Sequence, residues 1–135
     1  MDHTYYFAGN NRTISWVIEN NEIKAEQMRV HAQCHFDKFV VERSKYIALH
    51  VGIFWSIGKF IIKNGDKVRV MLDLKSMFEH LAENKNSKDS FMETRTNFIR
   101  QLISQRALGN RYQLIEPHEN CERILLSTKN YSNIH

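Results

Sequence analysis

The first third of the chain places apolar residues in short runs that are separated by turn signals. Residues 4–7 and 13–19 are rich in aromatic and β-branched side chains, and residues 22–32 alternate apolar with charged positions. Gly9-Asn10-Asn11 and Asn20-Asn21 separate these runs. Because Asn tolerates the backbone conformations of tight hairpin turns, the pattern predicts three antiparallel strands joined by short turns.

From residue 38 onward the apolar positions recur at helical spacing. Residues 38–63 predict a long helix that Asn64-Gly65 ends, with Gly65 suited to a left-handed cap. A strand at 67–72, helices at 74–83 and 90–107, a strand at 111–116 and a C-terminal helix at 118–131 follow. Strands joined by helices must pair in parallel through crossovers. The order βββαβααβα therefore predicts an α/β fold, a five-stranded mixed sheet with helices on both faces.

Composition narrows the class of protein without choosing a function. A length of 135 residues predicts a single domain over 1–135. The formal charge of +4 fits contact with nucleic acid or an acidic partner, and equally a slightly basic solvated surface. Cys34 and Cys121 are isolated from each other, which favours reduced thiols and an intracellular location, in the cytoplasm or the nucleus. His50 and Lys59 interrupt the apolar run 47–62, so a buried helix is expected there and no membrane contact.

Three stretches, taken in order, resemble the ribonuclease H-like superfamily. Residues 44–81 are similar to the stretch in which a family helix carries Glu-aromatic-x-Ala-Leu-x-x-Gly-Leu, before a Gly turn, a hydrophobic strand, an Asp and another helix. The residues that match this pattern are Tyr46, Ala48, Leu49, Gly52, Ile53, Gly65, Val68, Val70, Asp73, Met77 and Leu81. Residues 5–11 resemble the first strand of the family, and residues 112–127 resemble its last strand and helix, with His118, Asn120 and Leu126 in place.

The resemblance implies a metal-dependent site that this chain lacks in large part. Ribonucleases H cleave the RNA strand of a hybrid with two divalent metals, which four carboxylates hold. The four matching positions carry Ala8, Lys45, Asp73 and Ile124. We therefore expect no catalytic residue, no bound metal and no cofactor, and the Lys45 ammonium would compete with a cation. Glu42, one turn before Lys45, could replace a lost acid, so an active nuclease stays an alternative.

Asp73 has a second interpretation that needs no metal. It directly precedes the predicted helix 74–83, where an Asp can accept hydrogen bonds from the first backbone N–H groups. We therefore predict that Asp73 is the N-cap of that helix.

Basic residues beside aromatic ones suggest contacts with a nucleic-acid backbone, and a solvated face is the alternative. Arg12 lies at the first turn, where ribonucleases H touch nucleic acid, and His118 matches a family histidine that assists product release. The residues predicted to bind nucleic acid are Asn10, Asn11, Arg12, Lys75, Arg106, Arg111 and His118. His31 and His35, with Cys34 between them, lack a second Cys/His pair, so an ordinary cluster is favoured over a zinc site.

The sequence therefore predicts a catalytically inactive ribonuclease H-like domain. We expect it to act as a protein-binding adaptor in a pathway that handles RNA or DNA, such as RNA silencing, RNA processing or retroelement biology. A non-cleaving module that binds RNA or an RNA/DNA hybrid is the alternative. A protein partner would contact aromatic residues left outside the core. The aromatic residues considered are Tyr5, Tyr6, Phe36, Phe39, Phe54, Trp55, Phe78, Phe91 and Phe98.

Overall fold

The computed structural model describes residues 1–31, 41–87 and 89–120, called here the described residues. Their elements are β1 (Asp2–Gly9), β2 (Thr13–Glu19), β3 (Lys24–Val30), α1 (Val41–Gly58), β4 (Lys67–Leu72), α2 (Lys75–Ala82), α3 (Ser90–Gln105), β5 (Gly109–Leu114) and the short 3₁₀ helix η2 (Pro117–Glu119). This is the predicted order up to the last helix. Most of the predicted C-terminal helix 118–131 falls outside the described residues.

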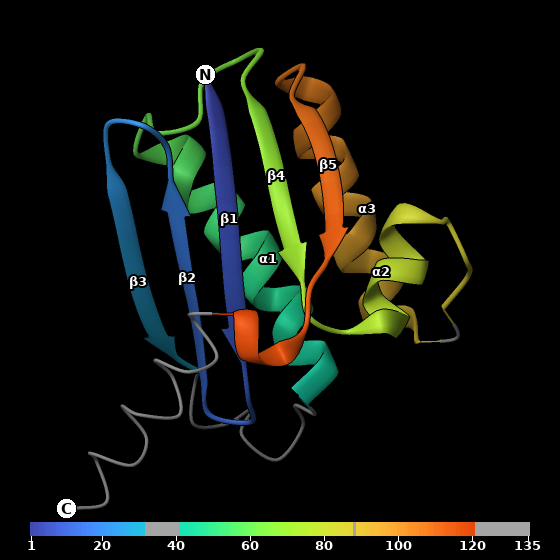
Figure 1. The fold of residues 1–135 in the computed structure, drawn as a ribbon. Coiled ribbons are helices and arrows are strands. Elements are labelled where there is room, and N and C mark those ends of the chain that lie inside the picture. The colour runs from blue at the N-terminus through green and yellow to red at the C-terminus, as the bar shows by residue number, and fades with distance from the viewer. Residues whose placement is uncertain (32–40, 88, 121–135) are drawn as a thin grey trace, which may run out of the picture.

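The strands form one five-stranded mixed sheet in the order β3-β2-β1-β4-β5. β1, β2 and β3 are antiparallel neighbours, as the hairpin signals predicted. β4 runs parallel to both β1 and β5, as the helical connections required. The predicted five-stranded mixed sheet is thus confirmed, and the carboxyl ends of β1, β4 and β5 meet at one edge (Figure 1).

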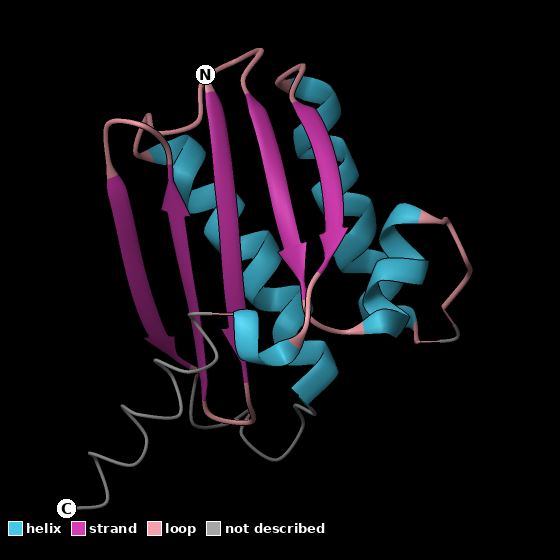
Figure 2. Ribbon diagram, in the orientation of Figure 1, coloured by secondary structure: helices cyan, strands magenta, loops and turns pink. Residues whose placement is uncertain are grey.

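The helices form a layer behind the sheet, on the face where the core lies (Figure 2). α1 packs against β1, β2 and α3. Tyr5, Trp16 and Leu49 are completely buried between α1 and the sheet. α1 and α3 lie on the same face, so the described residues place no long helix on the other face, where the sequence also predicted one. None of the described helices combines the length and the hydropathy that a membrane crossing requires.

The end of α1 differs from the prediction. The helix ends at Gly58 and does not continue to residue 63. Phe60 takes a left-handed φ of 61°, and the N–H groups of Ile61 and Ile62 both turn back to the Ser56 carbonyl. Gly65 does adopt a positive φ of 85°, but in the turn before β4 and not as the cap of α1. β5 begins two residues earlier than predicted, because the Gly109 N–H bonds the Asp66 carbonyl next to β4.

A glycine lets α1 approach β1 at the edge where the strands end. A Cβ added to Gly9 would lie 2.5 Å from Ser44 Oγ and 2.8 Å from the Ser44 carbonyl carbon. Any side chain at position 9 would therefore push the first turns of α1 away from the sheet. This close contact brings the next residue of α1, Lys45, to the carboxyl ends of β1 and β4.

Candidate functional site

Lys45 and Asp73 form a buried ion pair at the carboxyl edge of the sheet. The Lys45 Nζ donates to Asp73 Oδ1 at 2.7 Å, and the two side chains are 7% and 4% exposed. Asn120, which is completely buried, donates its Nδ2 to Asp73 Oδ2 at 3.0 Å and to the Phe7 carbonyl at 2.8 Å. Both carboxylate oxygens of Asp73 thus already accept hydrogen bonds. The group is held by an ammonium and an amide from parts of the chain that are far apart in sequence.

The prediction that Asp73 caps α2 is wrong. The N-cap of α2 is Leu74, in an extended conformation, and no side chain makes a capping hydrogen bond there. The carboxylate instead turns toward α1 and meets Lys45. A buried ammonium attracts a buried carboxylate more strongly than exposed helix N–H groups do, so the ion pair determines the side-chain direction.

Ala8 lies beside this pair and supplies no ligand. Asn120 joins Asp73 to the carbonyl of Phe7, the residue that precedes Ala8 in β1. Ala8 is 2% exposed and ends in a methyl group. Ile124, the fourth position of the comparison with the ribonuclease H pattern, lies outside the described residues. The described positions of the pattern therefore bring together a methyl group, an ammonium and one carboxylate.

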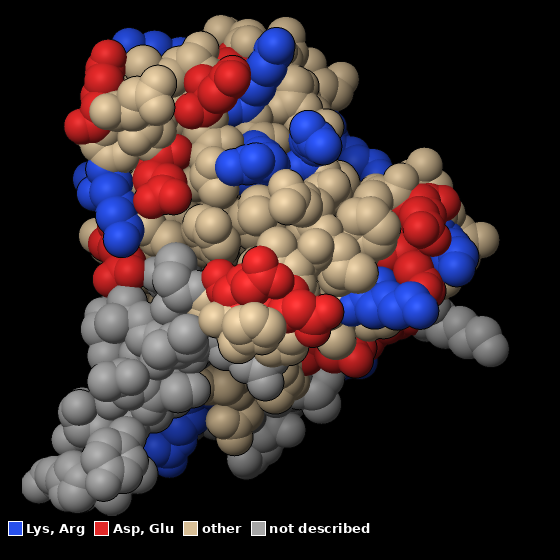
Figure 3. Space-filling model, in the orientation of Figure 1, with Lys and Arg blue, Asp and Glu red and all other residues tan. Residues whose placement is uncertain are grey.

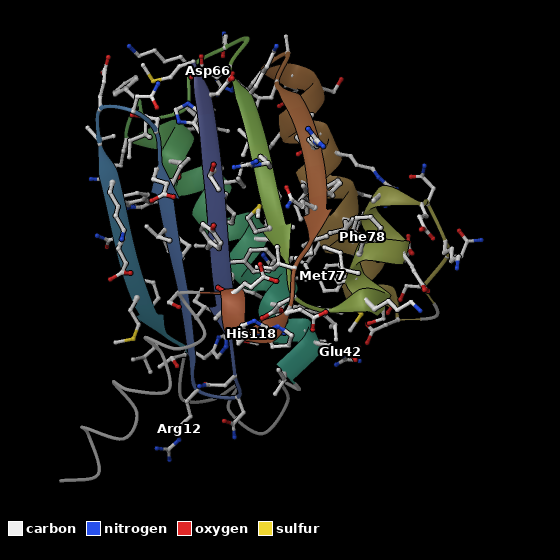
Figure 4. The ribbon with its side chains drawn as sticks, viewed as in Figure 1. Arg12, Glu42, Asp66, Met77, Phe78 and His118 are labelled. Atoms are coloured by element: carbon white, nitrogen blue, oxygen red, sulfur yellow. The ribbon has the colours of Figure 1, made fainter. Side chains whose placement is uncertain are left out.

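Glu42, the candidate replacement acid, lies on the surface and not in the buried pair of Lys45 and Asp73. It is exposed in the first turn of α1 (Figure 4). It lines a depression of about 270 Å³ together with Ser76 and Glu79 of α2. No group of three or more His, Cys, Asp or Glu side chains within the described ranges is arranged to hold a metal ion.

A second polar cluster, Tyr46–His80–Glu93, lies among the helices, with Tyr46 and His80 buried and the Glu93 side chain 35% exposed. His80 Nδ1 lies 2.7 Å from the Tyr46 hydroxyl, and His80 Nε2 lies 2.7 Å from Glu93 Oε1. The pKa of Glu93 is lowered by the Ser87 backbone N–H and by His80, against the effect of desolvation. An ionised Glu93 accepts from the His80 Nε2–H, which leaves Nδ1 to accept the proton of Tyr46.

This cluster has the connectivity of a hydroxyl–histidine–carboxylate relay but not its chemistry. Burial, followed by the charges of Glu42, Glu93 and Asp89, raises the pKa of Tyr46, so its hydroxyl stays protonated. The Tyr46 residue is only 2% exposed. The cluster therefore ties α1, α2 and α3 together and offers no nucleophile. No local sequence pattern predicts this cluster, because its members come from three helices. The available signal was His80 between the apolar Met77 and Leu81.

The structure does not bring the predicted nucleic-acid-binding residues together. Arg12 and His118 lie at the same end of the sheet, whereas Asp66 marks the opposite end (Figure 4). Arg106 belongs to that opposite end, because its carbonyl accepts from the Gly65 N–H beside β4. The other predicted residues are Asn10 and Asn11 in the β1–β2 turn, Lys75 at the start of α2, and Arg111 in the middle of β5.

Asn10 and His31 have contacts within the protein. Asn10 Oδ1 accepts from the backbone N–H groups of Arg12 and Thr13, both at 2.8 Å, and so shapes the β1–β2 turn. His31 is buried, with its Nε2 2.9 Å from Ser44 Oγ. Cys34 and His35, the other members of the possible zinc cluster, lie outside the described residues.

Among the described aromatic residues that were considered for a protein partner, Phe54 of α1 and Phe98 of α3 are exposed, as the sequence predicted for a few of them. Phe54 of α1 is 62% exposed and Phe98 of α3 is 48% exposed. The His50 ring stacks on Phe98 with centroids 5.5 Å apart, and His50 lies one turn before Phe54 on α1. We call His50, Phe54 and Phe98 the aromatic patch. Tyr5 is completely buried, and Phe36 and Phe39 lie outside the described residues.

Solved structures with a similar arrangement of elements are ribonucleases H. Ribonuclease H1 of the halophilic archaeon Halobacterium salinarum has a TM-score of 0.67 and 13% identity, and the match covers 89% of each chain. LC11-RNase H1, isolated from compost by a metagenomic approach, has a TM-score of 0.69 and 14% identity over 93% of this chain and 91% of its own. The N-terminal RNase H domain of Rv2228c from Mycobacterium tuberculosis has a TM-score of 0.67 and 11% identity over 96% and 98%.

These likenesses establish the fold at low sequence identity. No protein-family model matches the chain, and neither does any curated protein. The expected ribonuclease H-like fold is confirmed by structures that align over nearly the whole of both chains.

Proposed function

We propose that this ribonuclease H-like chain does not cleave nucleic acid and that it acts as a protein-binding adaptor in a pathway that handles RNA or DNA. The observation that carries the first part is the Lys45 ammonium, 2.7 Å from the Asp73 carboxylate. Two-metal cleavage requires several carboxylates that converge on a pair of cations. Lys45 stands where the ribonuclease H pattern has a Glu, and it supplies positive charge where a metal would.

The contacts of Asp73 explain how the edge of the sheet stays intact without a metal. A cation that bound Asp73 would have to displace the Lys45 Nζ and the Asn120 Nδ2 from the two carboxylate oxygens. It would then meet the Lys45 ammonium as a like charge, and Ala8 would offer no further oxygen. Such a site favours the lysine over a divalent ion on electrostatic grounds.

The aromatic patch supports a protein partner. Exposed aromatic side chains on a rigid helix surface are typical of protein-binding sites. Solved structures of the fold support the nucleic-acid setting, since LC11-RNase H1 has been solved in complex with an RNA/DNA hybrid and a foamy viral protease–reverse transcriptase in complex with double-stranded DNA. They also favour the second candidate function, a module that binds RNA or a hybrid without cleaving it.

A cleavage assay tests the loss of activity. We expect no cleavage of a labelled RNA/DNA hybrid in Mg²⁺ or Mn²⁺ by the native chain. The variant Ala8→Asp/Lys45→Glu/Ile124→Asp restores the acids of the pattern, and we expect it to bind Mn²⁺ in calorimetry and to gain cleavage. Cleavage by the native chain that Asp73→Asn abolishes would refute the proposal and support a nuclease with replacement acids such as Glu42.

Two binding experiments separate the partner classes. Titration of the labelled hybrid at low and high salt tests the nucleic-acid module, and no binding at low salt would exclude it. For the adaptor, a photo-crosslinking amino acid at Phe54 should capture a partner that the same amino acid at the exposed Glu22 does not. Phe98→Ser should abolish that capture, and capture that is equal from both positions would argue against the aromatic patch.

A further inference from the structure

The exposed face of the sheet carries a cluster of cations over the first halves of β4 and β5. The parallel register places Arg69 of β4 opposite Arg111 of β5, and Lys67 opposite Gly109. Lys67 and Arg69 are exposed and alternate with the buried Val68 and Val70 on β4, so they point away from the helices. Arg111 is also exposed and lies opposite Arg69 in the register, so it belongs to the same face. Figure 3 shows Lys and Arg side chains gathered over this part of the sheet. We call Lys67, Arg69 and Arg111 the basic sheet surface.

No ion pair within the described residues neutralises these three cations. Among the described residues, their one side-chain hydrogen bond runs from Arg69 Nη2 to Thr4 Oγ1 at 3.3 Å. Asp2 lies opposite Lys67 and Glu19 lies opposite Thr4, but neither carboxylate forms an ion pair with the surface. Like charges directly opposite each other on neighbouring strands, about 4.8 Å apart, destabilise a sheet. Arg69 and Arg111 are in that position, and an anion between them would relieve the repulsion.

The basic sheet surface is hollowed and not flat. It borders a depression of about 510 Å³, which Asp2, Thr4, Gly109 and Asn110 also line, so three cations and one carboxylate face this space. A Cβ added to Gly109 would lie 2.9 Å from Lys67 Cγ. The glycine thus leaves room for the Lys67 stem and opens the space between Lys67 and Arg111.

We propose that the basic sheet surface binds the sugar–phosphate backbone of a single-stranded nucleic acid. Phosphate is the anion that a pair of guanidinium groups holds best, because their N–H groups match its oxygens in geometry and charge. An open sheet face suits an extended single strand, whereas the base edges of a duplex are reached only by an element that enters a groove. Contacts to phosphates alone would be independent of base sequence and sensitive to salt.

This site is distinct from the edge where Lys45 and Asp73 meet. Lys67 begins β4, whereas Asp73 follows its last residue. The aromatic patch lies on the helical layer, on the opposite side of the sheet. The inference extends the proposed function, since an adaptor with these two surfaces could hold a protein on its helices and a nucleic acid strand on its sheet. It does not depend on the loss of cleavage.

The test is fluorescence anisotropy with a labelled 12-nucleotide oligouridine, in EDTA so that no metal chemistry contributes. Three phosphate contacts predict a slope of log K against log salt of about −2.1, so binding should weaken about 18-fold between about 50 and 200 mM salt. Arg69→Ser/Arg111→Ser should weaken binding at the lower salt at least about tenfold and reduce the slope to about −0.7. Oligothymidine of equal length should bind within about threefold of oligouridine, because the backbone charge is the same.

The matched control removes the same charge from the helical layer. Lys59→Ser/Arg100→Ser removes two exposed cations, Lys59 directly after α1 and Arg100 on α3. This variant should bind oligouridine within about twofold of the native chain. An equal loss in both variants would show an effect of net charge alone and overturn the proposal. So would binding of a polyglutamate peptide as tight as that of oligouridine, or tighter binding of a duplex. The two-arginine variant should melt no lower than the native chain, which separates lost binding from lost folding.

Discussion

Replacing Lys45 with Met should destabilise the fold strongly, because the buried Asp73 carboxylate would lose its counterion. The Nζ–Oδ1 distance of 2.7 Å corresponds to a Coulomb attraction of about 6 kcal/mol at an effective dielectric constant of about 20. The desolvation of two side chains that are 7% and 4% exposed offsets part of this attraction. Breaking a buried pair from one side costs about 3–5 kcal/mol, since the remaining charge stays buried without its counterion.

Urea unfolding followed by circular dichroism measures this loss. We expect Lys45→Met to lower the free energy of unfolding by about 3–5 kcal/mol and the melting temperature by about 10–20 °C. Lys45→Met/Asp73→Leu should recover most of the loss, because apolar residues of similar volume often replace a buried ion pair at little cost. The Asn120 amide keeps its bond to the Phe7 carbonyl in that double variant.

An exposed ion pair provides the matched control. Lys85 Nζ lies 3.5 Å from Glu79 Oε2, and the Lys85 side chain is 61% exposed. Lys85→Met removes an ammonium of the same kind and should change stability by less than about 1 kcal/mol. If Lys45→Met costs no more than Lys85→Met, then the ion pair does not hold the edge of the sheet, and the argument that Lys45 replaces a metal fails.

Three further predictions concern the contacts around this edge and the helical layer. Gly9→Ala should lower the free energy of unfolding in urea by about 1–3 kcal/mol, because its Cβ would clash with the backbone of α1. Gly58→Ala has no atom within 4 Å of its added Cβ and should leave the free energy of unfolding unchanged. Equal effects of the two substitutions would contradict the close approach of α1 to Gly9. Burial and the neighbouring Arg95 guanidinium lower the pKa of His50 below 6.5, so the unfolded chain binds the proton more readily than the folded chain. The free energy of unfolding should therefore fall as the pH drops below 6.5, and His50→Gln should reduce this dependence on pH. An unchanged slope in His50→Gln would contradict the lowered pKa of His50. Tyr46→Phe should cost about 1–3 kcal/mol, since buried His80 loses its hydroxyl donor, and a cost below about 0.5 kcal/mol would mean that the Tyr46 hydroxyl does not bind His80.

The pair of exposed arginines, Arg69 and Arg111, shows that the residue pattern of one strand does not specify which side chains of the next strand lie beside it. Alternation along β4 correctly separates buried Val68 and Val70 from exposed Arg69. The same alternation says nothing about the neighbour of Arg69, because that neighbour belongs to β5 and comes into register only through two helices. Arg111 was predicted to contact nucleic acid from its local sequence, but its pairing with Arg69 was not foreseen.

The prediction for Asp73 failed for a related reason. Its local sequence, an acid directly before a helix, is typical of an N-cap, and local sequence was the basis of that prediction. Lys45 lies 28 residues earlier and reaches Asp73 only because Gly9 admits α1 to the edge of the sheet. A long-range charge thus outweighed a local preference.

The sequence by itself determined the order of strands and helices, the mixed sheet, and the absence of acids at Ala8 and Lys45. It could do so because hydrophobic period, turn residues and residue identity are local properties of the chain. Only the tertiary structure decided which polar groups meet: Lys45 with Asp73, Tyr46 with His80, and Arg69 beside Arg111. These pairs depend on strand register and helix packing, which fix distances between residues far apart in sequence. The energies of charged and hydrogen-bonded groups depend on those distances and on burial, which no local pattern specifies.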